Sequence, residues 1–96
     1  MSAAPDEPRA WLVRGNLRLN AACYERYFGG MESVVMLYEA EPQRLWVLPV
    51  RAARAGGFVL KQANLRGDRS AAAHGFFRDH GIPDDCEREL LPRRLA

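Results

Sequence analysis

The sequence predicts a small α+β domain, and three observations lead to this fold class. Residues 15–28 have the pattern of a short strand that turns into a helix, and two glycines and an apolar strand follow. Residues 66–82 have a similar order of strand, helix and glycine. Between these two passages, apolar runs separated by a polar turn are typical of a β-hairpin. We therefore expect two strand–helix units with a central hairpin.

The first strand follows residues 1–9, whose prolines and acids predict a flexible tail. Apolar residues recur from Trp11 to Leu19 in the manner of a strand. Gly15 interrupts this run, which predicts a bulge or a tight bend within the strand.

The first helix is expected over residues 21–28. Asn20 precedes it and is a good N-cap, because its side-chain oxygen can accept from a backbone amide of the first turn. Helical spacing places Cys23 and Tyr27 on one buried face. The two glycines that follow tolerate the left-handed conformation and so predict the end of the helix.

The central hairpin is expected from strands over 34–38 and 45–48, joined by six residues of turn chemistry. Pro49 indicates that the second strand stops there or lies at an edge. Residues 51–55 have the composition of one helical turn, and residues 58–61 begin another strand.

The second unit opens with a turn over 64–68 and a strand from Arg69. A helix follows and ends at Gly81, because the proline two positions later cannot continue it. Residues 84–91 predict a last short helix capped by aspartates, and residues 92–96 a frayed tail.

Length and composition indicate one domain over residues 10–91, in a chain of 96 residues. No apolar stretch approaches the roughly 18–20 residues that span a bilayer. Residues 1–8 are polar and acidic rather than a signal peptide, so we expect a cytoplasmic protein and no membrane contact. Cys23 and Cys86 are far apart and have no CxxC spacing. So short a chain buries little surface, which favours a homodimer.

The net charge of +2 is too small to indicate a nucleic-acid partner by itself. Lys61 is the only lysine among 14 basic residues, so arginine supplies the rest. Arginine suits bidentate contacts to phosphate, carboxylate or guanine. With fourteen alanines alongside, a GC-rich bacterial genome explains the same bias.

The first unit resembles the swapped-hairpin AbrB-like domain of bacterial transition-state regulators and antitoxins. The features that carry the resemblance occur in the family's order: Gly15, a strand over 17–19, a helix to Phe28, Gly29 and Gly30, and a hairpin ending at Leu48-Pro49. The second unit, with Gly67, Arg69, a helix and Gly81-Ile82, is similar to a degraded copy, as in the tandem MraZ-like relatives. The resemblance implies a swapped-hairpin dimer that binds DNA.

DNA binding is one of two functional hypotheses. In the resembling domains, strand and loop arginines enter the major groove, and the matching residues here are Arg14, Arg18, Arg66 and Arg69. Strand alternation puts Arg14 and Arg18 on the same side if no bulge intervenes. The alternative is that these side chains are solvated surface arginines among twelve acids.

The second hypothesis is a protein-interaction module, an accessory subunit of a bacterial complex. Tyr24, Phe76 and Phe77 are the aromatic residues expected at its surface. Arginine and aromatic residues are favoured at interface centres, and the balanced charge fits a protein partner.

Enzymatic activity has no motif to support it, so we expect a non-enzymatic protein without cofactor or metal. His74 and His80 are six positions apart, which is not one helix face. Cys23 and His74 would make a nucleophile and base only if the fold joined them. Arg66-Gly67-Asp68 matches the adhesion tripeptide, but we interpret it as a turn whose charged residues face water.

Overall fold

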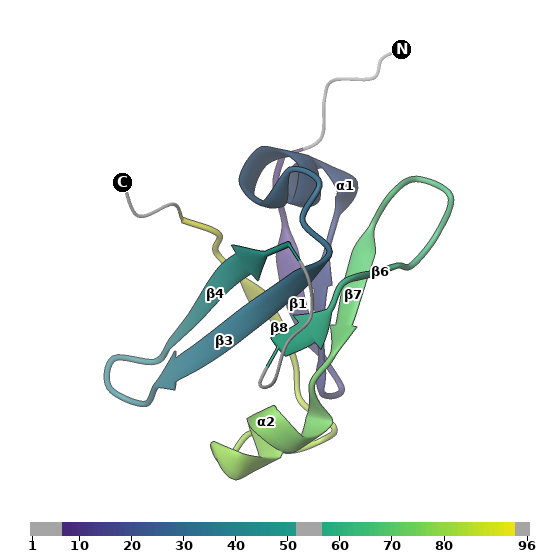
Figure 1. The fold of residues 1–96 in the computed structure, drawn as a ribbon. Helices are drawn as coiled ribbons and strands as arrows, with labels where there is room; N and C mark the ends of the chain where they lie inside the picture. The colour runs from purple at the N-terminus through teal and green to yellow at the C-terminus, as the bar shows by residue number, and fades with distance from the viewer. Residues whose placement is uncertain (1–6, 52–56, 94–96) are drawn as a thin grey trace.

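A computed structural model describes residues 7–51 and 57–93. They form two antiparallel sheets and two short helical segments, which confirms the α+β class (Figure 1). The two helical segments lie at opposite ends of the molecule (Figure 1).

The larger sheet has five strands in the order β6-β7-β2-β1-β8, all antiparallel to their neighbours. Its strands are β1 (Ala10–Val13), β2 (Asn16–Leu19), β6 (Lys61–Gln62), β7 (Arg69–Ala72) and β8 (Glu87–Leu90). The smaller sheet has the order β4-β3-β5. Its strands are β3 (Ser33–Glu39), β4 (Arg44–Val50) and β5 (Gly57–Val59).

The first apolar run is a hairpin rather than one bent strand. Arg14 and Gly15 form its turn with φ of 50° and 82°, so the chain reverses between β1 and β2. Leu12 then pairs with Leu17 across the hairpin. The expectation of a bend within a single strand is therefore wrong. Glycine tolerates this positive φ, which is costly for other residues.

The first helix begins and ends where the sequence predicts. It comprises α1 (Ala21–Cys23) and a π-helical continuation, η1 (Tyr24–Phe28). The Oδ1 atom of Asn20 accepts from the Cys23 amide at 2.8 Å, which confirms the N-cap. Gly30 follows the helix with φ of 79°.

The β3–β4 hairpin is confirmed and is longer than predicted at both ends. Pro49 lies inside β4 rather than after it, opposite Val34. A proline can occur there because β4 is an edge strand, and its missing amide disrupts no strand on the outer side.

The strand expected over 58–61 is divided between the two sheets. Gly57–Val59 joins β3, whereas Lys61–Gln62 joins β7. Leu60 is the buried crossing point, and its amide donates to the Glu32 carbonyl at 2.8 Å. Of the helical turn expected over 51–55, residues 52–55 lie outside the described part of the chain.

The second unit contains α2 (His74–Asp79), as predicted, but its last element differs. The helix expected over 84–91 is wrong, because this segment forms β8 and pairs along the whole of β1. The Arg14 amide also donates to the Cys86 carbonyl at 2.9 Å. Pairing with β8 satisfies the backbone N–H and C=O groups at the outer edge of β1. These groups would stay unpaired if residues 84–91 formed a helix.

The core lies between the two sheets. Leu12, Leu17 and Leu19 project from the larger sheet, and Val34 and Met36 from the smaller one. The helical segments close the ends of this core with Cys23, Phe28 and Phe77.

The segment before β1 is partly docked. The Arg9 amide donates to Asn20 Oδ1 at 3.0 Å, and its guanidinium forms an ion pair with Glu89 at 3.0 Å. Of the expected tails, residues 1–6 and 94–96 lie outside the described part of the chain.

Candidate functional site

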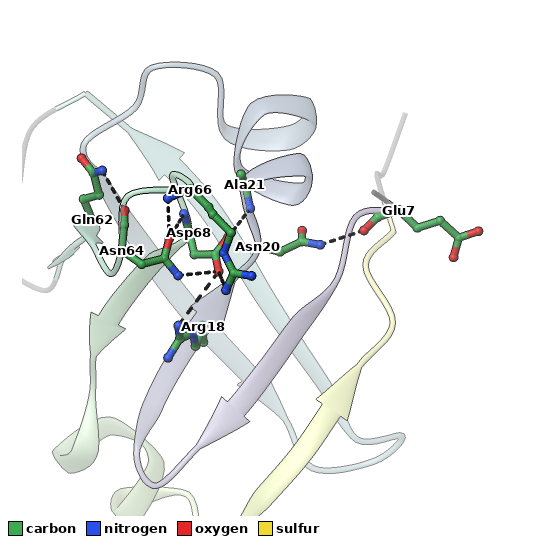
Figure 2. A network of polar contacts seen from close by, with 8 residues as sticks. All are labelled: Glu7, Arg18, Asn20, Ala21, Gln62, Asn64, Arg66 and Asp68. Carbon is green, nitrogen blue, oxygen red and sulfur yellow. Dashed lines mark hydrogen bonds and ion pairs between the residues drawn. The ribbon is translucent and has the colours of Figure 1, made fainter. Parts of the chain in front are cut away.

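Asp68 is the centre of a polar network that joins distant parts of the chain (Figure 2). It is only 7% exposed, so the expectation that it faces water is wrong. Its Oδ1 atom accepts from the Ala21 amide at 2.9 Å, across 47 positions of sequence. Its Oδ2 atom accepts from Asn64 Nδ2 at 2.9 Å.

The turn before β7 holds this carboxylate in place. Asn64 Oδ1 accepts from the backbone amides of Arg66 and Asp68, at 3.0 and 3.3 Å. Gly67, with φ of 96°, lets the chain turn between them. The turn thereby presents Asp68 to the start of α1 as a second cap beside Asn20.

The pKa of the Asp68 carboxyl lies below its ordinary value of 3.8. The hydrogen bond from Asn64 is the main cause, and the Ala21 amide and the nearby Arg66 and Arg18 add to it. Burial opposes the shift. The group therefore remains ionised at neutral pH.

Two of the four predicted DNA-contacting arginines meet at this carboxylate. Arg66 Nη2 lies 3.4 Å and Arg18 Nη2 lies 4.0 Å from Asp68 Oδ2 (Figure 2). Both guanidinium groups remain largely accessible, with side chains 80% and 42% exposed. One buried negative charge thus holds two arginines together at the surface.

The other two predicted arginines are placed differently. Arg14 lies in the β1–β2 turn and pairs with Glu87 at 3.0 Å, so it does not belong to the strand that carries Arg18. The strand alternation on which their expected common side depended therefore does not relate the two residues. Arg69 lies 4.3 Å from the centroid of the Tyr24 ring, and its Nε atom is buried without a hydrogen-bond partner in the described part of the chain.

The outer side of the smaller sheet is an apolar surface that the sequence did not reveal. Residues paired directly across antiparallel strands project to the same side. Because Val34 and Met36 are buried, Val35 and Leu37 project to the other side of β3, where Ser33 also lies but is only 1% exposed. We call this surface the apolar face, and its residues are Val35, Leu37, Trp46, Leu48, Val50 and Val59.

Three of the six residues of the apolar face are exposed, the other three are partly buried, and no charged residue lies at its centre. Leu37, Leu48 and Val59 are 57%, 46% and 46% exposed. Glu39 and Arg44 lie only at its hairpin end, where Trp46 Nε1 donates to Glu39 Oε1 at 2.9 Å. The run SVVMLY suggested a strand, but its nearly unbroken hydrophobicity did not show which side would be uncovered.

The three aromatic residues expected at an interaction surface are less available than predicted. Phe77 is only 1% exposed and belongs to the core, so that expectation is wrong for it. Phe76 is half-buried and packs edge-on against Phe58 and Phe77. Tyr24 is also half-buried, and its hydroxyl donates to the Met31 carbonyl at 2.8 Å.

The candidate catalytic groups are not brought together. Cys23 is 1% exposed, and burial raises the pKa of its thiol to about 11, which makes it a poor nucleophile at neutral pH. His74 packs against Gly15, whereas His80 packs against Tyr38 and Phe76. Within 7–51 and 57–93, no cluster of three or more histidine, cysteine or acidic residues could hold a metal ion.

None of the helices in the described ranges is long and apolar enough to cross a membrane. Comparisons with protein-family models, curated proteins and solved structures each gave no match.

Proposed function

We propose that the chain is a non-enzymatic protein-interaction module, an accessory subunit that contacts its partner through the apolar face. The observation that supports this proposal is the exposure of Leu37, Leu48 and Val59 on one side of a three-stranded sheet. Contiguous apolar patches of this kind are uncommon on monomers and mark interaction sites.

The composition of the apolar face fits the centre of an interface. Its members are aliphatic apart from Trp46, and charged residues occur only at its end. Interface centres are depleted in charge and enriched in aromatic residues in the same way. Trp46 is also suited to act as an anchor, because its indole nitrogen already has a partner in Glu39.

A partner is expected to pack onto this side of the sheet rather than add a strand to it. The free edge of the hairpin is β4, and Pro49 cannot donate a ladder hydrogen bond there. Proline and charge at edge strands are common protection against strand addition. We therefore expect binding to be strongest for a partner that covers the apolar face with apolar side chains.

Replacing both Leu37 and Leu48 with glutamate should abolish the interaction while the chain stays folded. Two carboxylates buried without partners should weaken binding about 100-fold or more. Both leucines are about half exposed in the free protein, so the variant should keep its circular dichroism spectrum and most of its stability. Binding is measured by co-purification from the native cell and by sedimentation of the purified protein.

Leu65→Glu is the matched control, because Leu65 is 100% exposed in a loop outside the apolar face. It should bind as the unmodified chain does. Sedimentation at increasing concentration shows whether a second copy is the partner, as expected for a homodimer. Equal recovery of the partner with the double variant and the control would contradict the proposal.

DNA binding by an AbrB-like regulator is the second candidate, and one observation favours it. Arg18 and Arg66 lie side by side at the Asp68 network and remain accessible. Such a pair could contact adjacent phosphates or a guanine edge. Asp68 and Glu87 already neutralise part of the predicted basic surface, so we rank this function below protein interaction.

Replacing Arg18 and Arg66 with alanine should reduce DNA affinity and lower the slope of log affinity against log salt by about 2. The Arg78→Ala variant is the control, because Arg78 is exposed, pairs with Asp84 and is not among the arginines predicted to contact DNA. Fluorescence anisotropy with genomic fragments at several salt concentrations measures both quantities. An unchanged slope, or absence of salt-dependent binding by the unmodified chain, would exclude this function.

A further inference from the structure

A pocket of about 190 Å³ lies between the tip of the β3–β4 hairpin and the segment that joins α2 to β8. Its apolar walls come from both sheets and from α2, and include Leu12, Leu45, Phe77 and Leu90. None of the six residues of the apolar face lines it, and of the two charged residues at the hairpin end of that face only Arg44 does. The pocket is thus a separate site from the proposed protein interface.

The polar residues of the pocket come from two distant segments. Gln43 and Arg44 belong to the hairpin tip, and Arg88 belongs to β8. Arg88 Nη1 donates to Gln43 Oε1 at 3.2 Å, which links the two walls. An apolar interior is therefore combined with guanidinium groups at its polar side.

None of the residues that line this pocket is acidic. Five arginines of the described chain form ion pairs with carboxylates, namely Arg9, Arg14, Arg18, Arg66 and Arg78. In the same part of the chain, neither Arg44 nor Arg88 has such a partner. A guanidinium has five N–H donors, and the bond to Gln43 uses only one of those of Arg88.

We propose that this pocket binds a small carboxylic acid that carries an apolar tail. The planar fork of Arg88 matches a carboxylate in bidentate geometry, and Arg44 adds a second positive charge. The tail lies against the leucine and phenylalanine side chains inside. Because drug-sized ligands occupy about 300–1,000 Å³, this smaller pocket suits a tail of roughly six to eight carbons.

Sodium octanoate is the probe for this site. Titration of the whole chain, followed by backbone amide signals in nuclear magnetic resonance, should shift the signals of Gln43, Ile82 and Cys86 in a saturable way. For a ligand of this size we expect a dissociation constant on the order of 0.1–1 mM. Octanol lacks the charge and acetate lacks the tail, so each should bind at least about 10-fold more weakly.

Arg88→Gln should weaken octanoate binding at least about 10-fold, since it removes the charge and the fork. Arg78→Gln is the matched control, because Arg78 is exposed, pairs with Asp84 and does not line the pocket. Arg88 is also exposed, so both variants should fold, as their amide spectra will show. The Leu37→Glu, Leu48→Glu variant should bind octanoate normally, which separates this site from the proposed interface.

Three results would overturn the proposal. Binding of octanol as tightly as octanoate would make the pocket a general apolar site. Arg88→Gln could bind octanoate as the unmodified chain does, which would exclude recognition of the carboxylate there. Finally, signals away from the pocket could shift without saturation, which would indicate adventitious contact only.

Discussion

Replacing Phe77 with alanine is expected to lower the free energy of unfolding by about 3–5 kcal/mol. Phe77 is the largest of the fully buried side chains and is 1% exposed. It joins the second unit to the core formed by Leu17, Leu19 and Val34. A small domain is stable by only about 5–15 kcal/mol, so this change alone should bring the chain close to unfolding.

Phe76→Ala is the matched control, since it removes the same atoms from the neighbouring position. Phe76 is half-buried, so we expect a loss of about 1–2 kcal/mol. Urea denaturation followed by tryptophan fluorescence and circular dichroism measures both values. Equal losses for the two variants would contradict the assignment of Phe77 to the core and Phe76 to its margin.

Replacing Asp68 with alanine is expected to lower the free energy of unfolding by about 2–4 kcal/mol. The change removes the acceptor of the Ala21 amide and of the Asn64 side chain. It also leaves Arg18 and Arg66 side by side without the carboxylate between them. The variant therefore loses the hydrogen bonds that hold the start of α1 and the turn before β7 together.

The same variant should change the dependence of stability on pH. The pKa of Asp68 is lowered in the folded chain, so its contribution is present above the ordinary value of 3.8. It is lost as the pH falls through the lower, folded value. The difference in stability between the unmodified chain and Asp68→Ala should therefore be largest at neutral pH and shrink as the pH falls below about 4.

Asp84→Ala is the control for this experiment, because Asp84 forms an exposed ion pair with Arg78. Exposed pairs contribute about 0–1 kcal/mol, so the control should lose little stability at any pH. Unfolding by urea at a series of pH values gives both curves. A constant difference between Asp68→Ala and the unmodified chain down to pH 2 would show that the carboxylate charge is not what stabilises the turn.

The elements that depend on local chemistry could be predicted from the sequence. Asn20 caps the first helix because its side chain reaches an amide three positions away. Gly30 follows that helix in the left-handed region, and Pro83 follows the second helix. The β3–β4 hairpin has enough apolar residues on both sides of its turn to be recognised without knowledge of the rest of the chain.

The sequence predictions are wrong where contacts between residues distant in the sequence decide the structure. The Arg14-Gly15 turn lacks the Asn-Gly or Asp-Gly signal of a tight hairpin, so the reversal was interpreted as a bend. That error also treated Arg14 and Arg18 as residues of one strand. The segment before residue 91 is rich in glutamate, arginine and leucine, which favour helix, but the open edge of β1 turns it into β8.

The candidate sites were the least predictable part. Asp68 was expected at the surface because its partner, Ala21, lies 47 positions away. Likewise, strand alternation does not tell which side of β3 a second layer will cover. The pocket needs Gln43 and Arg88 together, and only the completed fold brings them within hydrogen-bond distance.

The pairing of β1 with β8 has a consequence for how the protein folds during its synthesis. Ala10 emerges from the ribosome early, whereas its partner Leu90 emerges among the last residues of the described chain. Contacts of such long separation slow folding, since the intervening loop must close first. Until residue 90 is free, the nascent chain keeps one edge of β1 open and exposes the apolar side chain of Leu12 to chaperones or to other chains.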